Sequence, residues 1–131
     1  MSTPHVPEYL TTHVLAGDRL VFALDREAAE LTRGLAGHGR RAVTLSKQAP
    51  LSIVLMAMEA GNHVAEHATA GTTTILAVSG EVRVLVGGKE EVILRDRQLA
   101  VIGPGVRHDL RADRESLLLI TVALAEETPK P

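Results

Sequence analysis

Beyond residue 41 the chain alternates short apolar runs with glycines and charged turns. In several runs apolar and polar side chains take turns, as a strand with one covered face requires, and EVRVLV at 81–86 is the clearest case. The pair Gly87 and Gly88 predicts a hairpin, because both residues accept the positive φ of a tight turn. The eight predicted strands occupy residues 42–46, 51–59, 73–79, 81–87, 90–95, 99–103, 106–111 and 116–124. Eight short strands at this spacing predict an all-β sandwich or barrel. Within it, the almost wholly apolar stretches 51–58 and 117–122 are typical of strands covered on both faces.

The first forty residues follow a different pattern. Residues 1–12 are polar with two prolines and predict an arm, and residues 19–23 predict a short strand. Asp25 can cap a helix that runs to about Leu35, since its apolar side chains fall on one face. We therefore expect one domain with three parts, namely an arm, strand and short helix at 1–40, a barrel at 41–125 and a flexible tail at 126–131.

Composition narrows the possible partners. The net charge of -2 provides no basic field for nucleic acid, and Tyr9 and Phe22 are the only aromatic residues available to stack on bases or sugars. Without cysteine there is no disulfide, zinc–thiolate site or thiol nucleophile. The first ten residues lack a secretory pattern, and no apolar run approaches the roughly 20 residues that span a bilayer. We expect a cytoplasmic protein with no nucleic-acid or membrane partner.

Two stretches resemble the paired motifs of the cupin superfamily. They are GNHVAEHATAGTT at 61–73, followed by six residues and Gly80, and RQLAVIGPGVRH at 97–108. The resemblance covers about residues 41–124, and the short stretch between the motifs is similar to that of small microbial single-domain cupins. It implies a jelly-roll, RmlC-like double-stranded β-barrel behind a short helix and arm. It also implies a homodimer, in which Tyr9 and Phe22 of the arm region would be buried at the contact.

The metal-binding positions of these motifs are only half filled with histidine. Carried over position by position, the ligands of metal-dependent cupins fall on His67, Thr69, Thr73 and His108. Threonine hydroxyls are neutral, weak ligands, which argues against a four-ligand site of the oxalate-oxidase type. We expect the same four residues to bind a small molecule in a cavity whose apolar lining consists of Ile75, Ala77, Val106 and Leu110.

A third histidine, His63, leads to the hypothesis of a metal site. It lies four residues before His67, and an even separation in an extended strand points both side chains to one side. Together with His108 they would offer three nitrogens to zinc, nickel, copper, iron or manganese. The other interpretation is a solvated His63 beside a buried, hydrogen-bonded histidine pair. By alternation, Glu66 and Asp109 are expected to point away from the cavity.

The residues favour a small monocupin that binds a small, largely apolar organic ligand with one polar or anionic group, with or without a divalent metal. The alternative is a metal-dependent dioxygenase or isomerase acting on a small organic acid, whose iron site would need Glu59 as its carboxylate. A metal-free epimerase of the cupin kind is disfavoured, because the resemblance implies a tyrosine acid that the barrel region lacks.

Overall fold

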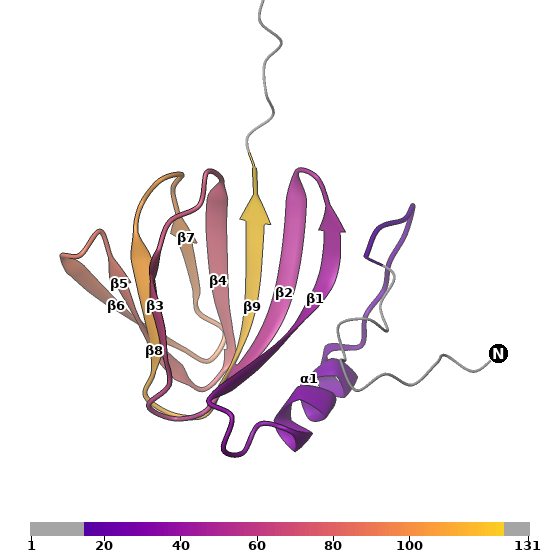
Figure 1. The fold of residues 1–131 in the computed structure, drawn as a ribbon, viewed down its shortest axis with the longest axis horizontal. Helices are drawn as coiled ribbons and strands as arrows, with labels where there is room; N and C mark the ends of the chain where they lie inside the picture. The colour runs from indigo at the N-terminus through magenta and orange to yellow at the C-terminus, as the bar shows by residue number, and fades with distance from the viewer. Residues whose placement is uncertain (1–14, 125–131) are drawn as a thin grey trace, which may run out of the picture.

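The computed structural model describes residues 15–124, with the backbone alone at Glu66 and His67. Within this range it contains α1 (Leu24–Arg33) and the strands β1 (Arg40–Gln48), β2 (Leu51–Met58), β3 (His63–His67), β4 (Thr72–Ser79), β5 (Glu81–Val86), β6 (Glu90–Arg95), β7 (Leu99–Ile102), β8 (His108–Ala112) and β9 (Ser116–Ala123). They form a five-stranded sheet in the order β1-β2-β9-β4-β7 and a four-stranded sheet in the order β3-β8-β5-β6. The two antiparallel sheets face each other as a sandwich (Figure 1), which confirms the predicted β architecture behind a short helix.

The main core lies between the two sheets. On β4, Ile75 and Ala77 are buried and alternate with partly exposed neighbours. On β5, Val82 and Val84 do the same from the opposite sheet. Successive side chains of a strand point to opposite faces, so these buried positions are the inner faces of both sheets.

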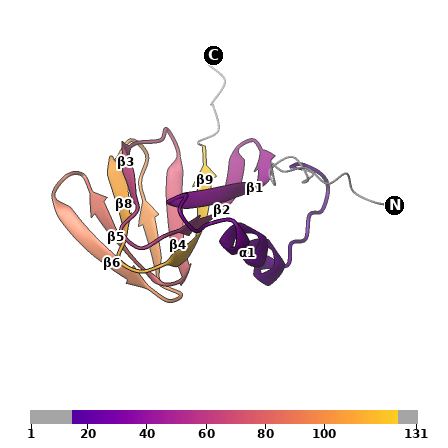
Figure 2. The ribbon, with the colours of Figure 1, turned by 60° about the horizontal axis from the view of Figure 1, so that its bottom comes forward.

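A second apolar cluster covers the outer face of the five-stranded sheet. Figure 2 shows α1 on the side of β1 and β2 that is turned away from the four-stranded sheet. Leu31 of α1 and Leu55 of β2 are fully buried in this cluster, while the next residue of β2, Met56, packs against the core between the sheets. β2 is therefore covered on both faces, as its nearly continuous apolar sequence predicts.

The predicted strand at 19–23 is wrong. These residues form no strand, and Phe22 instead packs against the cluster under α1. The helix begins after Ala23, whose side chain makes no capping bond, so Asp25 is not the cap but an acid of the first turn. An acid is favourable there because the amide groups of a first turn lack helical partners. The helix ends at Arg33, before the Gly34 C-cap and somewhat earlier than predicted.

The strand pattern of the barrel is largely as expected, with one addition. The hairpin at Gly87 and Gly88 is confirmed, with φ of 63° and 71° between β5 and β6. β3 is a ninth strand that the apolar pattern did not reveal, because HVAEH has no apolar run. The predicted arm at 1–12 and tail at 126–131 lie outside the described residues. No helix in the described range is long and apolar enough to cross a membrane.

Candidate functional site

A cavity of about 210 Å³ lies between the two sheets. The five-stranded sheet contributes side chains of β2, β4 and β9, and the four-stranded sheet contributes side chains of β3 and β8. The lining residues are Val54, Met56, Val64, Ile75, His108, Leu110 and Ile120. Ile75 and Leu110 confirm part of the predicted lining, whereas Ala77 and Val106 pack in or against the core without lining the cavity. The cavity is therefore apolar apart from one imidazole.

His108 is the polar side chain of this lining. It is 2% exposed and begins β8, and its Nδ1 lies 3.2 Å from the carbonyl oxygen of Val106. A carbonyl oxygen only accepts hydrogen bonds, so this contact favours the tautomer that carries its proton on Nδ1. In that neutral tautomer Nε2 is an acceptor. The fixed ring gives the cavity one directional polar group in apolar surroundings.

Thr69 and Thr73 bond to each other rather than lining the cavity. Their Oγ1 atoms lie 3.1 Å apart, and Thr69 Oγ1 also donates to the carbonyl oxygen of Gly71 at 2.8 Å. Because Thr69 has a single hydroxyl proton, Thr73 is the donor between the two hydroxyls. The Thr69 carbonyl oxygen accepts from the Gly105 N–H at 2.8 Å, which links the β3–β4 connection to the turn before β8. Both hydroxyl protons are thus used within the protein, and the predicted ligand contact of these threonines stays a prediction.

His63 lies apart from His108, because it pairs with Arg111 on the outer face of the sheet. His63 pairs with Arg111 and Val64 with Leu110, but the register then shifts before His67 pairs with His108. The argument from the even separation of His63 and His67 assumed a regular strand pairing, which β3 does not keep over this stretch. The His63 side chain is 46% exposed, and its Nε2 lies 3.1 Å from Asp109 Oδ2 on the outer face of the sheet.

The predicted three-histidine metal site is not brought together by these positions. The backbone of His67 lies opposite His108, but the side chains of His67 and Glu66 are outside the described residues, as are the expectations that depend on them. Among the described side chains, no three histidines or carboxylates form a group that could hold a metal ion.

Glu59, the carboxylate considered for an iron site, binds backbone amide groups of a loop. It accepts hydrogen bonds from the backbone N–H groups of Gly39 at 2.7 Å and Gly37 at 3.2 Å. These bonds, the Gly39 bond first, hold the pKa of Glu59 below its usual value. The described donors therefore do not fit a metal centre of three or four ligands.

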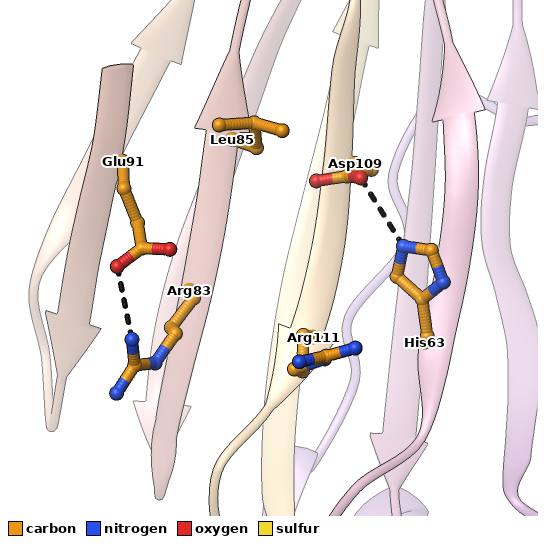
Figure 3. A pocket seen from close by; sticks show the side chains of 6 residues that line it. All are labelled: His63, Arg83, Leu85, Glu91, Asp109 and Arg111. Atoms are coloured by element: carbon orange, nitrogen blue, oxygen red, sulfur yellow. Dashed lines mark hydrogen bonds and ion pairs between the residues drawn. The ribbon is translucent and has the colours of Figure 1, made fainter. Parts of the chain in front are cut away.

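A second cavity, of about 290 Å³, lies on the outer face of the four-stranded sheet (Figure 3). Its lining residues are His63, Arg83, Leu85, Glu91, Asp109 and Arg111. Asp109 faces outward as predicted, but it is bonded to His63. The alternation in EVRVLV and HDLRA marks Arg83 and Arg111 as outward residues. Only the strand register, which the sequence does not reveal, places them side by side.

Arg83 is the best-neutralised cation of this outer cleft. Its Nε donates to Asp113 Oδ2 at 2.8 Å and its Nη1 to Glu91 Oε1 at 2.9 Å. The bond to Asp113 is the main cause that raises the pKa of Arg83, and the same bond lowers the pKa of Asp113. Arg83 thereby joins β5, β6 and the residue after β8.

Comparisons with known proteins agree with this architecture. A model of the Cupin domain family matches residues 54–123. A conserved protein of unknown function from Streptococcus pyogenes is 16% identical with a TM-score of 0.64, over 97% of this chain and 93% of that one. An RmlC-like cupin from Shewanella frigidimarina is 24% identical with a TM-score of 0.62, over 70% and 82% of the two chains. A salicylate 1,2-dioxygenase from Pseudaminobacter salicylatoxidans is 18% identical with a TM-score of 0.68, over 78% of this chain and 34% of that one. At these identities the likeness is one of fold. The search of curated proteins gives no match.

The Asp113–Arg83 pair predicts an acid-dependent loss of stability. Because the pKa of Asp113 is held below its ordinary value of 3.8, the pair stabilises the fold above that value, and the contribution disappears as pH falls through the lowered pKa. Asp113→Asn should lower the free energy of unfolding at neutral pH and weaken its fall in acid, measured by urea denaturation from neutral pH to about pH 2. Glu115→Gln is the control, since Glu115 is exposed and makes no ion pair among the described residues. Wild-type acid dependence in Asp113→Asn would contradict this account.

Proposed function

The chain belongs to the Cupin domain family, and from that premise we propose that it is a small monocupin that binds a small organic acid in the cavity between its sheets. The observation that supports this most is the lining of the cavity, in which six apolar side chains surround His108. An apolar pocket with few polar groups is the usual form of a small-molecule site. The apolar residues provide affinity, and the imidazole selects for a polar group on the ligand.

The volume of the cavity limits the size of this ligand. At about 210 Å³ it exceeds the roughly 150 Å³ of a protein cavity that accepts benzene. It lies below the roughly 300 Å³ at which pockets for drug-sized molecules begin. The proposed ligand therefore contains one ring or a short aliphatic chain, with a single polar group.

His108 defines the chemistry of that polar group. The ring is 2% exposed and has apolar neighbours, so a ligand group that contacts it makes few hydrogen bonds with water. A carboxylic acid suits the site because an imidazole and a carboxyl group can share one proton near neutral pH, as an ion pair or as a neutral hydrogen bond. A ligand without a polar group would forgo this interaction.

A metal-dependent dioxygenase or isomerase is the alternative function, and the described residues support it less. The dioxygenase named above shares the fold at 18% identity, which carries no chemistry over to this chain. The described donors do not form a metal centre of three or four ligands. Binding of a divalent metal through His67 and His108 stays a prediction, as does the cytoplasmic location.

The chain is further proposed to form a homodimer through the open part of the outer face of the five-stranded sheet. α1 covers β1 and β2, whereas Leu99 and Val101 on the edge strand β7 are 56% and 64% exposed. Leu99 lies opposite Leu76 on β4, and Leu76 in turn lies opposite Leu119 on β9. Leu119 packs against the cluster under α1, so the three leucines form an apolar row across the outer face. A second copy would cover this apolar row and protect an edge strand. The aromatic contact expected from the sequence stays a prediction, since Phe22 is partly buried against the cluster under α1 and Tyr9 is outside the described residues.

Benzoate is a suitable probe of the cavity. We expect it to raise the melting temperature of the wild type, and to stabilise the fold by about 2.7 kcal/mol at a hundred times its Kd. His108→Gln should weaken binding about tenfold in calorimetry, because the amide cannot share a proton with the ligand. Arg111→Gln, which changes the outer cleft, is the matched control and should bind benzoate like the wild type. Stabilisation by sugar phosphates alone, or equal benzoate affinity in His108→Gln, would contradict the proposal.

The dimer is tested by placing a charge on the exposed outer face of β7, next to the apolar row. Val101→Lys should shift sedimentation at micromolar concentration from dimer to monomer, because a lysine would have to be desolvated at the contact. Val21→Lys is the control, since Val21 is 84% exposed and lies before α1. A wild-type chain that sediments as a monomer, or a Val101→Lys dimer as stable as the wild type, would refute the contact.

A further inference from the structure

The outer cleft of the four-stranded sheet lies back to back with the interior cavity. Along β8, His108 and Leu110 line the interior cavity, whereas Asp109 and Arg111 line the outer cleft. This separation follows from the alternation of side chains in a strand. A ligand in the outer cleft would therefore meet different residues and a different chemistry, independent of the proposed interior ligand.

A row of basic side chains crosses three strands in this cleft. The strand register places Arg111 directly opposite both His63 on β3 and Arg83 on β5. Like charges in directly opposite positions destabilise a sheet unless each one is neutralised.

Two of the three basic side chains have acidic partners. His63 has Asp109, and Arg83 has both Glu91 and Asp113. The guanidinium of Arg111 makes no direct ion pair or hydrogen bond with any side chain that the structure describes, although its charge helps to lower the pKa of Asp113. Arg111 is therefore a planar, five-donor group held in a cleft and available to a planar acceptor such as a carboxylate.

The neighbouring row of the same face has the opposite character. Leu85 lies opposite Asp109 on one side and Glu91 on the other. Figure 3 shows Leu85 between the strands that carry these two carboxylates, with Arg111 on the row below. Rows on one face are two residues apart along a strand, which corresponds to about 7 Å. The cleft thus presents Arg111 in one row and, in the next row, Leu85 flanked by two carboxylates.

The charge of the cleft decides which ligand suits it. The basic side chains of Arg83, Arg111 and His63 lie near three carboxylates, those of Glu91, Asp109 and Asp113. A simple anion at Arg111 would be repelled by the acidic row, and a simple cation at the acidic row would leave Arg111 unneutralised. A molecule that carries both charges satisfies both rows without adding net charge.

We propose that the outer cleft binds a small ω-amino acid in its zwitterionic form. The carboxylate pairs with the Arg111 fork, the methylene chain spans the step from the Arg111 row to the Leu85 row, and the ammonium group lies in that second row between Asp109 and Glu91. The roughly 7 Å between the rows favours a short chain of methylene groups over an α-amino acid, whose two charges are closer together. A bidentate guanidinium–carboxylate pair supplies direction as well as attraction.

The probe for this site is 4-aminobutanoate, titrated into the full chain and followed by the NMR signals of Arg111 Nε–Hε and the Leu85 methyl groups. We expect saturable shifts at both residues, at least tenfold weaker binding of butanoate and of butylamine, and weaker binding of glycine. Arg111→Gln should remove the saturable shift at Leu85. Arg26→Gln makes the same charge change on α1, which packs on the other, five-stranded sheet, and should leave the shift intact.

Three results would overturn the proposal. They are no saturable shift with 4-aminobutanoate, wild-type binding by Arg111→Gln, or equally tight binding of butanoate, which would make the cleft a plain anion site. An unchanged Leu110 methyl signal in Arg111→Gln shows that the fold is intact, because Leu110 is buried on the opposite face of the same strand. Benzoate binding at His108 is measured separately, so failure of one site does not imply failure of the other.

Discussion

The pairing of β3 with β8 is the contact on which both cavities depend. It places Val64 beside Leu110 on the inner face and His63 beside Arg111 on the outer face, before the register shifts ahead of His67. β3 has five residues and a polar sequence. Its own apolar side chains are too few to hold it in the sandwich, so the strand depends on its pairing with β8. The rest of the sandwich has larger supports, namely the core between the sheets and the cluster under α1.

The inner cavity is better suited to binding than to a reaction that needs several polar groups. Among the described lining residues only His108 is polar, and the nearby motif threonines use their hydroxyl protons on each other and on Gly71. Glu59 is held by two backbone amides of the loop before β1. Thr69 and Thr73, two of the positions that resemble the metal ligands of cupins, therefore have structural partners here. What remains in the cavity is apolar volume with one imidazole, and the proposed binding of a small weak acid rests on these two features.

Much of the fold is predictable from the sequence because local patterns express it. The hairpin at Gly87 and Gly88 and the doubly covered β2 both follow from residue type and period. The strand expected at 19–23 fails because its apolar residues pack under a helix instead of pairing. In the site, His108 is correctly expected in the cavity, whereas His63 lies on the outer face beside Asp109. The parity argument assumed a regular register, and no single strand reveals the shift that interrupts it. The outer cleft could not be predicted, since it arises only where the rows of β3, β8, β5 and β6 meet.

The most direct test of the central claim is to locate benzoate in the bound protein by nuclear Overhauser effects. Ile75 and Leu110 line the cavity from opposite sheets and are both buried. The account predicts contacts from the benzoate ring protons to the methyl groups of both residues and to the His108 ring, which only a ligand between the sheets can make. Contacts to Leu85 or Leu99 on the outer faces, with none to Ile75 and Leu110, would contradict it.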